Sequence, residues 1–299
     1  MELQIENLSK KYPNGTQALQ GVSLNIPQGM FGLLGPNGAG KSTLMRTLAT
    51  LQEADGGKAS MGEVDVLRQK DVVRRMLGYL PQEFGLYPKV SAEDLLAHFA
   101  VLKGISNAKE RRDTVQALLQ QTNLYDHRKK PLGSFSGGMK QRFGIAQALL
   151  GSPKLIIVDE PTAGLDPEER VRFHNLLSAI GQNIIVILST HIVSDVSDLC
   201  QAMAIIHEGR VRVAGNPAAL VAELNGKVWK KSIAHDEIQG YRERLKLISM
   251  RLFAGQTLVH VLSDEQPEAG FEQTTPDLED LYFATIRGFL HRPSAGPVN

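Results

Sequence analysis

Residues 35–43 read Gly-Pro-Asn-Gly-Ala-Gly-Lys-Ser-Thr and directly follow the apolar stretch Phe31–Leu34. Glycines in such a loop let backbone N–H groups turn towards phosphate oxygens without a Cβ in the way, and the start of the following helix favours an anion. This pattern of strand, loop and helix predicts a site for a nucleoside triphosphate. The site takes in the whole stretch: Gly35, Pro36, Asn37, Gly38, Ala39, Gly40, Lys41, Ser42 and Thr43.

The last three residues of the loop carry the side chains that act on phosphate. Lys41 is expected to reach the β and γ phosphates, Ser42 to ligate Mg²⁺, and Thr43 to contact phosphate from the next helical position. A chance glycine-rich turn would not need this order of residues between a strand and a helix. A nucleoside triphosphate with Mg²⁺ is therefore the predicted ligand.

A second motif is the apolar run Leu155–Val158, which is followed directly by the acidic residues Asp159 and Glu160. At the carboxyl edge of a parallel sheet, these acids are expected to face the phosphate loop. Asp159 is predicted to hold the Mg²⁺ shell through water, and Glu160 to act as the general base or to orient the attacking water. The alternative is that both acids simply end the strand on a solvated face.

A second helix start with exposed N–H groups is predicted at Ser136, Gly137 and Gly138. On its own, a Ser-Gly-Gly stretch is more often a plain helix cap. It precedes the acidic strand end, however, and lies far along the chain from the first phosphate loop. Two helix ends suited to phosphate suggest that both contact a shared nucleotide.

The order of apolar segments predicts an α/β core. The segment Leu3–Leu8 alternates apolar and polar residues, and a turn leads to Ala18–Ile26, which together indicate an antiparallel β edge. Short apolar runs then alternate with amphipathic helical stretches, as in a parallel sheet covered by helices. These runs are Phe31–Leu34, Leu155–Val158, Ile184–Ser189 and Ala202–Ile206.

The remaining segments divide the chain further. A helical subdomain is expected at about residues 86–151, with helices beginning near Ser91, Ser106 and Ser136. The main domain is expected to span residues 1–225. A small α+β appendage follows at 226–290, with strands at 227–233, 248–253 and 256–262 and a last helix at about 278–288. Residues 291–299 are expected to form a disordered tail.

Composition narrows the possible partners and the compartment. The chain of 299 residues has 33 Lys and Arg against 32 Asp and Glu, so no net field favours nucleic acid or acidic lipid. Cys200 is the one cysteine, which fits a reducing cytoplasm and a small buried side chain. The N-terminal segment has neither the basic start nor the apolar run of a secretory signal. The apolar runs are of strand length, so any membrane role would need another chain.

Taken together, these elements resemble the ATP-binding subunit of ATP-binding cassette (ABC) transporters over roughly residues 2–220. The resemblance implies that Tyr12 stacks on adenine and that Gln82 links Mg²⁺ to the transmembrane partner. It also implies that Ser136–Arg142 is the signature motif, that Asp166 lies in the loop that crosses the dimer, and that His191 is the switch histidine near the γ phosphate. The chain departs from the family where Phe135 replaces a frequent Leu and Met139 a frequent Gln.

The resemblance also implies an assembly. Two cassettes, as a homodimer or a heterodimer, are expected to pack head to tail, with the phosphate loop of one copy and the signature of the other enclosing each ATP. The protein is then expected in the cytoplasm, on the inner face of the membrane, where polytopic permease subunits hold it.

The stretches Gly32–Asn37 and Pro276–Tyr282 resemble those of ABC-2 type exporters. The alternative is a soluble ABC ATPase in a cytosolic assembly or repair process. P-loop GTPases are disfavoured because the sequence lacks the Asn-Lys-x-Asp stretch that reads guanine. In such transporters the substrate contacts the membrane subunits, so this sequence does not predict which substrate is transported.

Overall fold

The computed structural model describes residues 1–82, 85, 87–253 and 255–290. Its centre is a six-stranded sheet of strand order β10-β9-β3-β8-β7-β6. The strands pair in parallel, except that β10 runs antiparallel to β9. Their bounds are β3 Gly29–Leu34, β6 Leu77–Leu80, β7 Leu155–Asp159, β8 Ile185–Thr190, β9 Ala202–His207 and β10 Arg210–Gly215.

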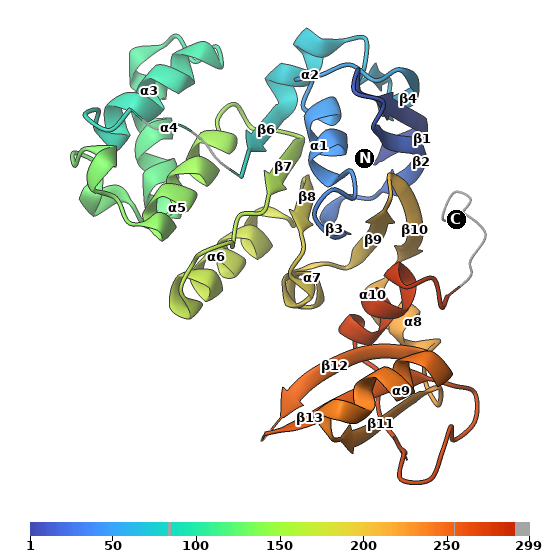
Figure 1. Ribbon diagram of the computed structural model, residues 1–299. Helices are drawn as coiled ribbons and strands as arrows, with labels where there is room; N and C mark the ends of the chain where they lie inside the picture. Colours follow the sequence, from blue (N-terminus) through green and yellow to red (C-terminus); the bar gives the residue numbers. More distant parts are fainter. Residues whose placement is uncertain (83–84, 86, 254, 291–299) are drawn as a thin grey trace.

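Two smaller antiparallel sheets accompany the central one (Figure 1). The first has the order β2-β1-β4-β5 and forms the predicted antiparallel edge, with β1 Leu3–Lys11, β2 Gln17–Ile26, β4 Gly56–Met61 and β5 Val64–Asp65. The other has the order β12-β13-β11-β14 and lies near the end of the chain, with β11 Val228–Ile233, β12 Leu247–Phe253, β13 Gln256–Leu262 and β14 Glu272–Gln273.

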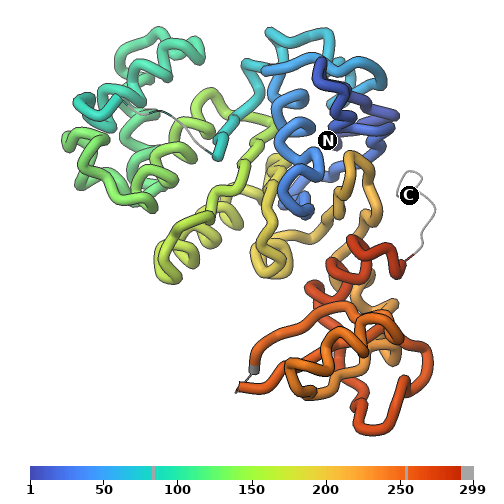
Figure 2. Tube along the Cα trace, in the orientation of Figure 1, coloured from blue at the N-terminus to red at the C-terminus, as the bar shows by residue number. Residues whose placement is uncertain are grey.

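The helices fall into three groups. Helices α1 (Lys41–Leu48) and α2 (Lys70–Met76) adjoin the first two sheets. The helical subdomain consists of α3 (Ala92–Leu102), α4 (Ala108–Gln121) and α5 (Gly137–Ala148). The remaining helices are α6 Pro167–Ile180, α7 Val193–Leu199, α8 Pro217–Ala222, α9 Ile238–Arg244 and α10 Leu278–Ile286. Figure 2 shows the α3–α5 group and the last sheet at separate ends of the molecule.

Side-chain caps set the start of several helices. The Ser91 Oγ accepts the Asp94 N–H at the start of α3, 3.1 Å away, as the sequence predicted. The predicted start of α4 at Ser106 is wrong by one residue, because Asn107 Oδ1 accepts the N–H groups of both Lys109 and Glu110. An amide oxygen that satisfies two free donors makes Asn107 the cap.

Apolar packing joins the central sheet to helices on both faces. One cluster contains Phe31, Leu44 and Ile157 and connects the antiparallel edge, α1 and the central sheet. A second cluster covers the other face with side chains from α6, α7 and α10, including Phe173, Val196 and Leu281. The last helix therefore packs on the central sheet as well as on the sheet at the end of the chain (Figure 1).

Gly32 allows α7 to lie close to strand β3. A Cβ at this position would come within 2.7 Å of the Val196 side chain and 3.2 Å of the Cys200 Sγ. Cys200 is buried there, and burial, followed by the Asp195 charge, raises the pKa of its thiol to about 12. The thiol is therefore protonated at neutral pH and packs as a small apolar group, as the sequence predicted.

Several elements were not predicted. They are β4, β5, α2, β6, α7, β10, α8, α9 and β14. Strand β4 begins with Gly-Gly-Lys, and α2 reads KDVVRRM with Val73 buried, so neither carries a clear apolar period. Paired neighbours hold these segments in place, rather than their own pattern.

Some predictions concern residues or boundaries that the structure does not test. The predicted start of the helical subdomain at residue 86 and the predicted tail at 291–299 lie outside the described residues. The division of the chain at residue 225 remains a prediction. Within the described ranges, no helix is both long and apolar enough to cross a membrane.

Candidate active site

The loop between β3 and α1 needs glycine at two positions where the chain passes close to its neighbours. A Cβ on Gly35 would lie 2.4 Å from the Ile206 carbonyl oxygen, and one on Gly40 would lie 2.4 Å from that of Ala18. Gly40 also has a φ of +105°, a backbone conformation that residues with a side chain rarely adopt. Gly40 provides no side-chain cap for α1, so the N–H groups of Lys41, Ser42 and Thr43 are left for an anion, while the Leu44 N–H donates to the Gly40 carbonyl oxygen.

Lys41 is folded back over the loop, with only 6% of its surface exposed. Its Nζ donates to the Gly35 carbonyl oxygen at 2.6 Å and lies 3.3 Å from Glu160 Oε1. A buried ammonium of this kind requires anionic partners. The ammonium is thus fixed at the mouth of the loop, where the phosphates of a nucleotide are expected.

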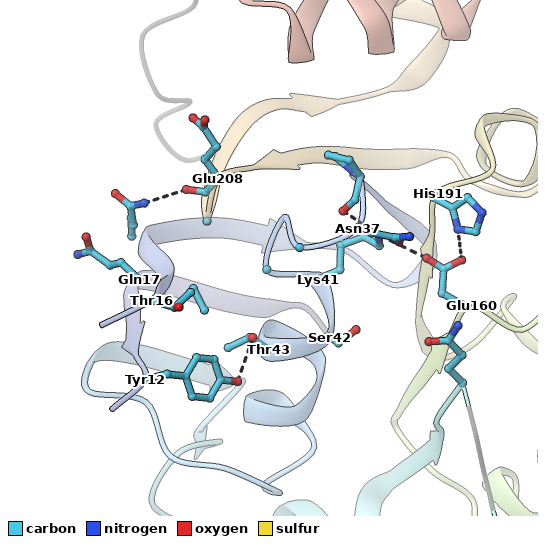
Figure 3. A pocket seen from close by; sticks show the side chains of 17 residues that line it. Tyr12, Thr16, Gln17, Asn37, Lys41, Ser42, Thr43, Glu160, His191 and Glu208 are labelled. Carbon is cyan, nitrogen blue, oxygen red and sulfur yellow. Dashed lines mark hydrogen bonds and ion pairs between the residues drawn. The ribbon is translucent and has the colours of Figure 1, made fainter. Parts of the chain in front are cut away.

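Glu160 forms a polar chain with residues from two other segments (Figure 3). Its Oε2 lies 2.6 Å from Nδ1 of His191, while Oε1 faces Lys41. The backbone of Glu160 has a φ of +49°, which is unusual for a residue with a side chain, and its N–H donates to the Ser189 carbonyl oxygen at 2.8 Å. This constrained turn after β7 aims the carboxylate between the lysine and the histidine.

Asp159 lies just behind this pair and is 4% exposed. Burial raises the pKa of its carboxyl, an effect that the hydroxyls of Ser189 and Ser42 partly oppose. Its Oδ1 has no hydrogen-bond partner among the described residues. A buried oxygen without a donor beside a serine hydroxyl fits a hard cation such as Mg²⁺. In the described part of the chain, no group of three or more His, Cys, Asp or Glu side chains could hold a metal ion.

The Asp159→Asn change should therefore separate stability from activity. Because burial disfavours the charged carboxylate, the isosteric neutral amide should raise the melting temperature of the nucleotide-free protein. The same change should abolish the predicted Mg²⁺-dependent hydrolysis of a nucleotide, since an amide oxygen is a poorer ligand than a carboxylate for the metal that Asp159 is predicted to hold. Thermal unfolding and phosphate release measure the two effects. A melting temperature below that of the unchanged protein would contradict the argument from burial.

A cleft of about 460 Å³ brings most of the predicted residues together (Figure 3). This volume suits a small-molecule site. The predicted residues that line it are Tyr12, Pro36, Asn37, Gly38, Gly40, Lys41, Ser42, Thr43, Gln82, Glu160 and His191. The predicted residues Gly35, Ala39 and Asp159 are not among those that line it.

Tyr12 is fixed at one end of the cleft by its hydroxyl. The hydroxyl lies 3.2 Å from Thr43 Oγ1 and donates to Gln52 Oε1, also at 3.2 Å. The ring is partly exposed at the cleft, and Thr43 connects it to the helix that follows the phosphate loop. Its stacking on adenine remains a prediction.

The sequence did not reveal the wall of the cleft beside Tyr12. This wall is formed by Thr16, Gln17, Ala18, Gln20, Glu208 and Gly209. The Gln20 N–H donates to the Gly209 carbonyl oxygen at 2.8 Å, and the Gly209 N–H donates to the Ala39 carbonyl oxygen at 2.9 Å. The contacts thereby join strand β2, the β9–β10 turn and the phosphate loop. The predicted turn at Pro13–Gly15 was a signal for the part of this wall at residues 16–20. No signal in the sequence pointed to the part at Glu208 and Gly209.

The other predicted helix start lies elsewhere on the chain. Ser136 caps α5, with its Oγ accepting the Met139 N–H at 3.2 Å, and Asp166 caps α6, with its Oδ1 accepting the Glu169 N–H at 2.9 Å. Gly138 packs against the Glu169 side chain. The described lining of the cleft includes none of Ser136, Gly137, Gly138 and Asp166. One chain therefore does not bring the two helix starts together.

Comparison with known proteins identifies the family of this chain. Residues 19–163 match the family model described as ABC transporter. The chain is 31% identical to the uncharacterized ABC transporter ATP-binding protein YxlF of Bacillus subtilis, covering 95% of this chain and 99% of that protein. It is 35% identical to the daunorubicin/doxorubicin resistance ATP-binding protein DrrA of Streptomyces peucetius, covering 81% and 74% of the two.

Two further matches are a longer relative and a solved structure. The chain is 31% identical to the probable multidrug ABC transporter ATP-binding protein YbhF of Escherichia coli but spans about half (52%) of its length. A dimeric post-hydrolysis structure of the ATP-binding cassette MJ0796, bound to ADP and Pi, superposes with a TM-score of 0.65 at 25% identity, covering 72% of this chain and 98% of that one. With the phosphate loop, the buried carboxylates and these relatives in agreement, the chain belongs to the ATP-binding proteins of ABC transporters, a family of ATPases.

Proposed function

We propose that this protein binds and hydrolyses ATP to power a membrane transporter, an exporter of the ABC-2 type. The observation that supports this best is the contact chain Lys41–Glu160–His191 at the floor of the cleft, with 3.3 Å between Lys41 Nζ and Glu160 Oε1 and 2.6 Å between Glu160 Oε2 and His191 Nδ1. Lys41 supplies a cation for phosphate, Glu160 a carboxylate that can act on water, and His191 a second polar group in contact with that carboxylate.

In the proposed reaction, the phosphates of ATP lie on the N–H groups at the start of α1, and the Lys41 ammonium turns from Glu160 towards them. The freed Glu160 carboxylate then accepts a proton from the attacking water or orients it towards the γ phosphorus. His191 keeps the carboxylate in place through its Nδ1 contact. Ser42, Gln82 and Asp159 would hold Mg²⁺, which supplies positive charge against the phosphate oxygens.

The proposed assembly is a head-to-tail dimer. Ser136, Gly137 and Gly138 begin α5 outside the cleft, and a second copy would bring its own α5 start over the ATP in the first. Asp166 begins α6 beside them, because Gly138 packs on Glu169 of that helix. ATP then becomes the link between two chains, and its hydrolysis releases them. A homodimer and a heterodimer both fit this arrangement.

The proposed partner is a polytopic permease on the inner face of the membrane. The names of YbhF and DrrA refer to multidrug transport and to drug resistance, which favours export over import. We further propose that residues 1–225 are the cassette and that residues 226–290 form an accessory domain that steadies the dimer. The transported compound would be bound by the permease.

A purification from membranes tests the transport role. Glu160→Gln protein, gently solubilised with ATP present, should bring a polytopic membrane protein with it, because ATP that is not hydrolysed keeps the dimer closed. Lys41→Met protein, treated in the same way, should recover much less of this partner. Recovery of soluble partners alone would instead favour a cytosolic assembly or repair ATPase.

A further inference from the structure

Asp195 is the most deeply buried carboxylate near the site, with 0% exposure, and it does not line the cleft. Its Oδ2 accepts a hydrogen bond from Thr162 Oγ1 at 2.6 Å and one from Thr190 Oγ1 at 3.2 Å. Thr162 follows Glu160 by two residues, and Thr190 directly precedes His191. One oxygen of Asp195 thus holds the segments that carry both predicted catalytic side chains.

The other oxygen of Asp195 holds helix α6. Its Oδ1 lies 2.9 Å from Arg170 Nε, 2.7 Å from the Arg170 NH2 nitrogen and 2.9 Å from His174 Nε2. Arg170 is in the first turns of α6, the helix that Asp166 caps. The same carboxylate therefore connects the segments of Glu160 and His191 to the helix that begins at Asp166.

Packing alone does not call for this arrangement. A buried carboxylate is costly unless it is paired and hydrogen-bonded, and an apolar residue would join α6 to α7 at lower cost. Thr190 Oγ1 also accepts the Ile192 N–H at 3.0 Å, which fixes the turn on the far side of His191. Polar contacts of this kind have defined directions, so a shift of one segment changes the contacts of the others.

We propose that Asp195 is a positioning residue that couples the two ATP sites of the dimer. Movement of Thr162 and Thr190, when ATP engages Glu160 and His191 in one cleft, is transmitted through Asp195 to Arg170 and so to Asp166. In the head-to-tail dimer, Asp166 faces the other copy's cleft. The inference rests on the dimer of the proposed function. It assigns to Asp195 a role in communication rather than in chemistry.

The test is the dependence of ATPase rate on ATP concentration, measured on the full chain. The unchanged protein should give a Hill coefficient clearly above 1, as expected for a coupling of about fivefold or more between sites. Asp195→Asn keeps the shape but loses the charge that holds Arg170 and His174, and should give a Hill coefficient of 1. A merely structural role would lower the rate and the melting temperature and leave the Hill coefficient unchanged.

Two further variants complete the test. Asp198→Asn alters a carboxylate on the same helix that is 60% exposed and lies 3.9 Å from His174 Nδ1, and it should retain the Hill coefficient of the unchanged protein. Arg170→Met removes the ion pair between Asp195 and α6 while leaving both threonine contacts and the His174 contact at 2.9 Å. It serves if Asp195→Asn does not fold, and its Hill coefficient should also fall to about 1, because the proposed path to Asp166 runs through Arg170.

Retained cooperativity in Asp195→Asn or in Arg170→Met overturns the proposal, as does a Hill coefficient of 1 in the unchanged protein. Failure of Glu160→Gln to form a dimer with ATP is a separate result, because it overturns the proposed function itself. The two failures are therefore distinguishable.

Discussion

Glu160→Gln should lower steady-state ATP hydrolysis by at least ~10²-fold and leave ATP binding intact. The amide has the shape of the carboxylate and can still contact His191, whose Nδ1 lies 2.6 Å from Oε2. It cannot accept a proton from water at neutral pH. The variant should therefore bind ATP, close as a dimer and stay closed. Phosphate release at saturating ATP and size-exclusion chromatography with and without ATP measure both effects.

A matched control is Glu208→Gln. Glu208 also lines the cleft, but its side chain is 69% exposed and pairs with Arg212 at the surface. Its neutralisation should change the hydrolysis rate by less than about twofold, because exposed pairs contribute little. Near-normal turnover by Glu160→Gln, or an equal loss in Glu208→Gln, would argue against the role of Glu160.

Lys41→Met should weaken ATP binding by about 10- to 100-fold, the loss expected for one charge-assisted hydrogen bond of about 1.5–3 kcal/mol. The change also leaves Glu160 buried without its cation, since Lys41 Nζ and Glu160 Oε1 are 3.3 Å apart. The Glu160 carboxylate, left with its His191 contact alone, should repel the phosphates. Equilibrium titration with a fluorescent ATP analogue measures the affinity.

The double variant Lys41→Met with Glu160→Gln separates the two contributions to the lost affinity. If repulsion by the Glu160 carboxylate is part of the loss, the double variant should bind ATP more tightly than Lys41→Met alone, though more weakly than Glu160→Gln. An unchanged dissociation constant in Lys41→Met would show that the ammonium does not contact the nucleotide.

Much of the fold and of the site could be predicted from the sequence because it depends on residues that are close together along the chain. The strand, loop and helix around Lys41 are consecutive, so the sequence alone predicted the phosphate loop. The close approach of Gly35 to Ile206 and of Gly40 to Ala18 is seen only in the structure. Asp159 and Glu160 end a strand whose apolar pattern is plain. Residues adjacent in sequence, at the end of a buried strand, must lie at the edge of the sheet.

Other parts of the site depend on neighbours that are distant in sequence. Gln20 contacts Gly209, and both line the cleft, yet nothing in either segment signals the other. Strand β4 and helix α2 escaped prediction for the same reason, since their weak apolar patterns are completed by pairing with β1 and by packing against β6. The apolar pattern of one segment does not predict which other segment it packs against.

The sequence by itself determined that a nucleotide-binding α/β core is present and which residues carry its phosphate loop and its acids, because turn glycines and buried strands leave local patterns. The tertiary structure decided which of these residues share one cleft. It joined Lys41, Glu160 and His191 in contact and left Ser136, Gly138 and Asp166 on another surface, since distances across a fold are set by strand order and packing rather than by spacing along the chain.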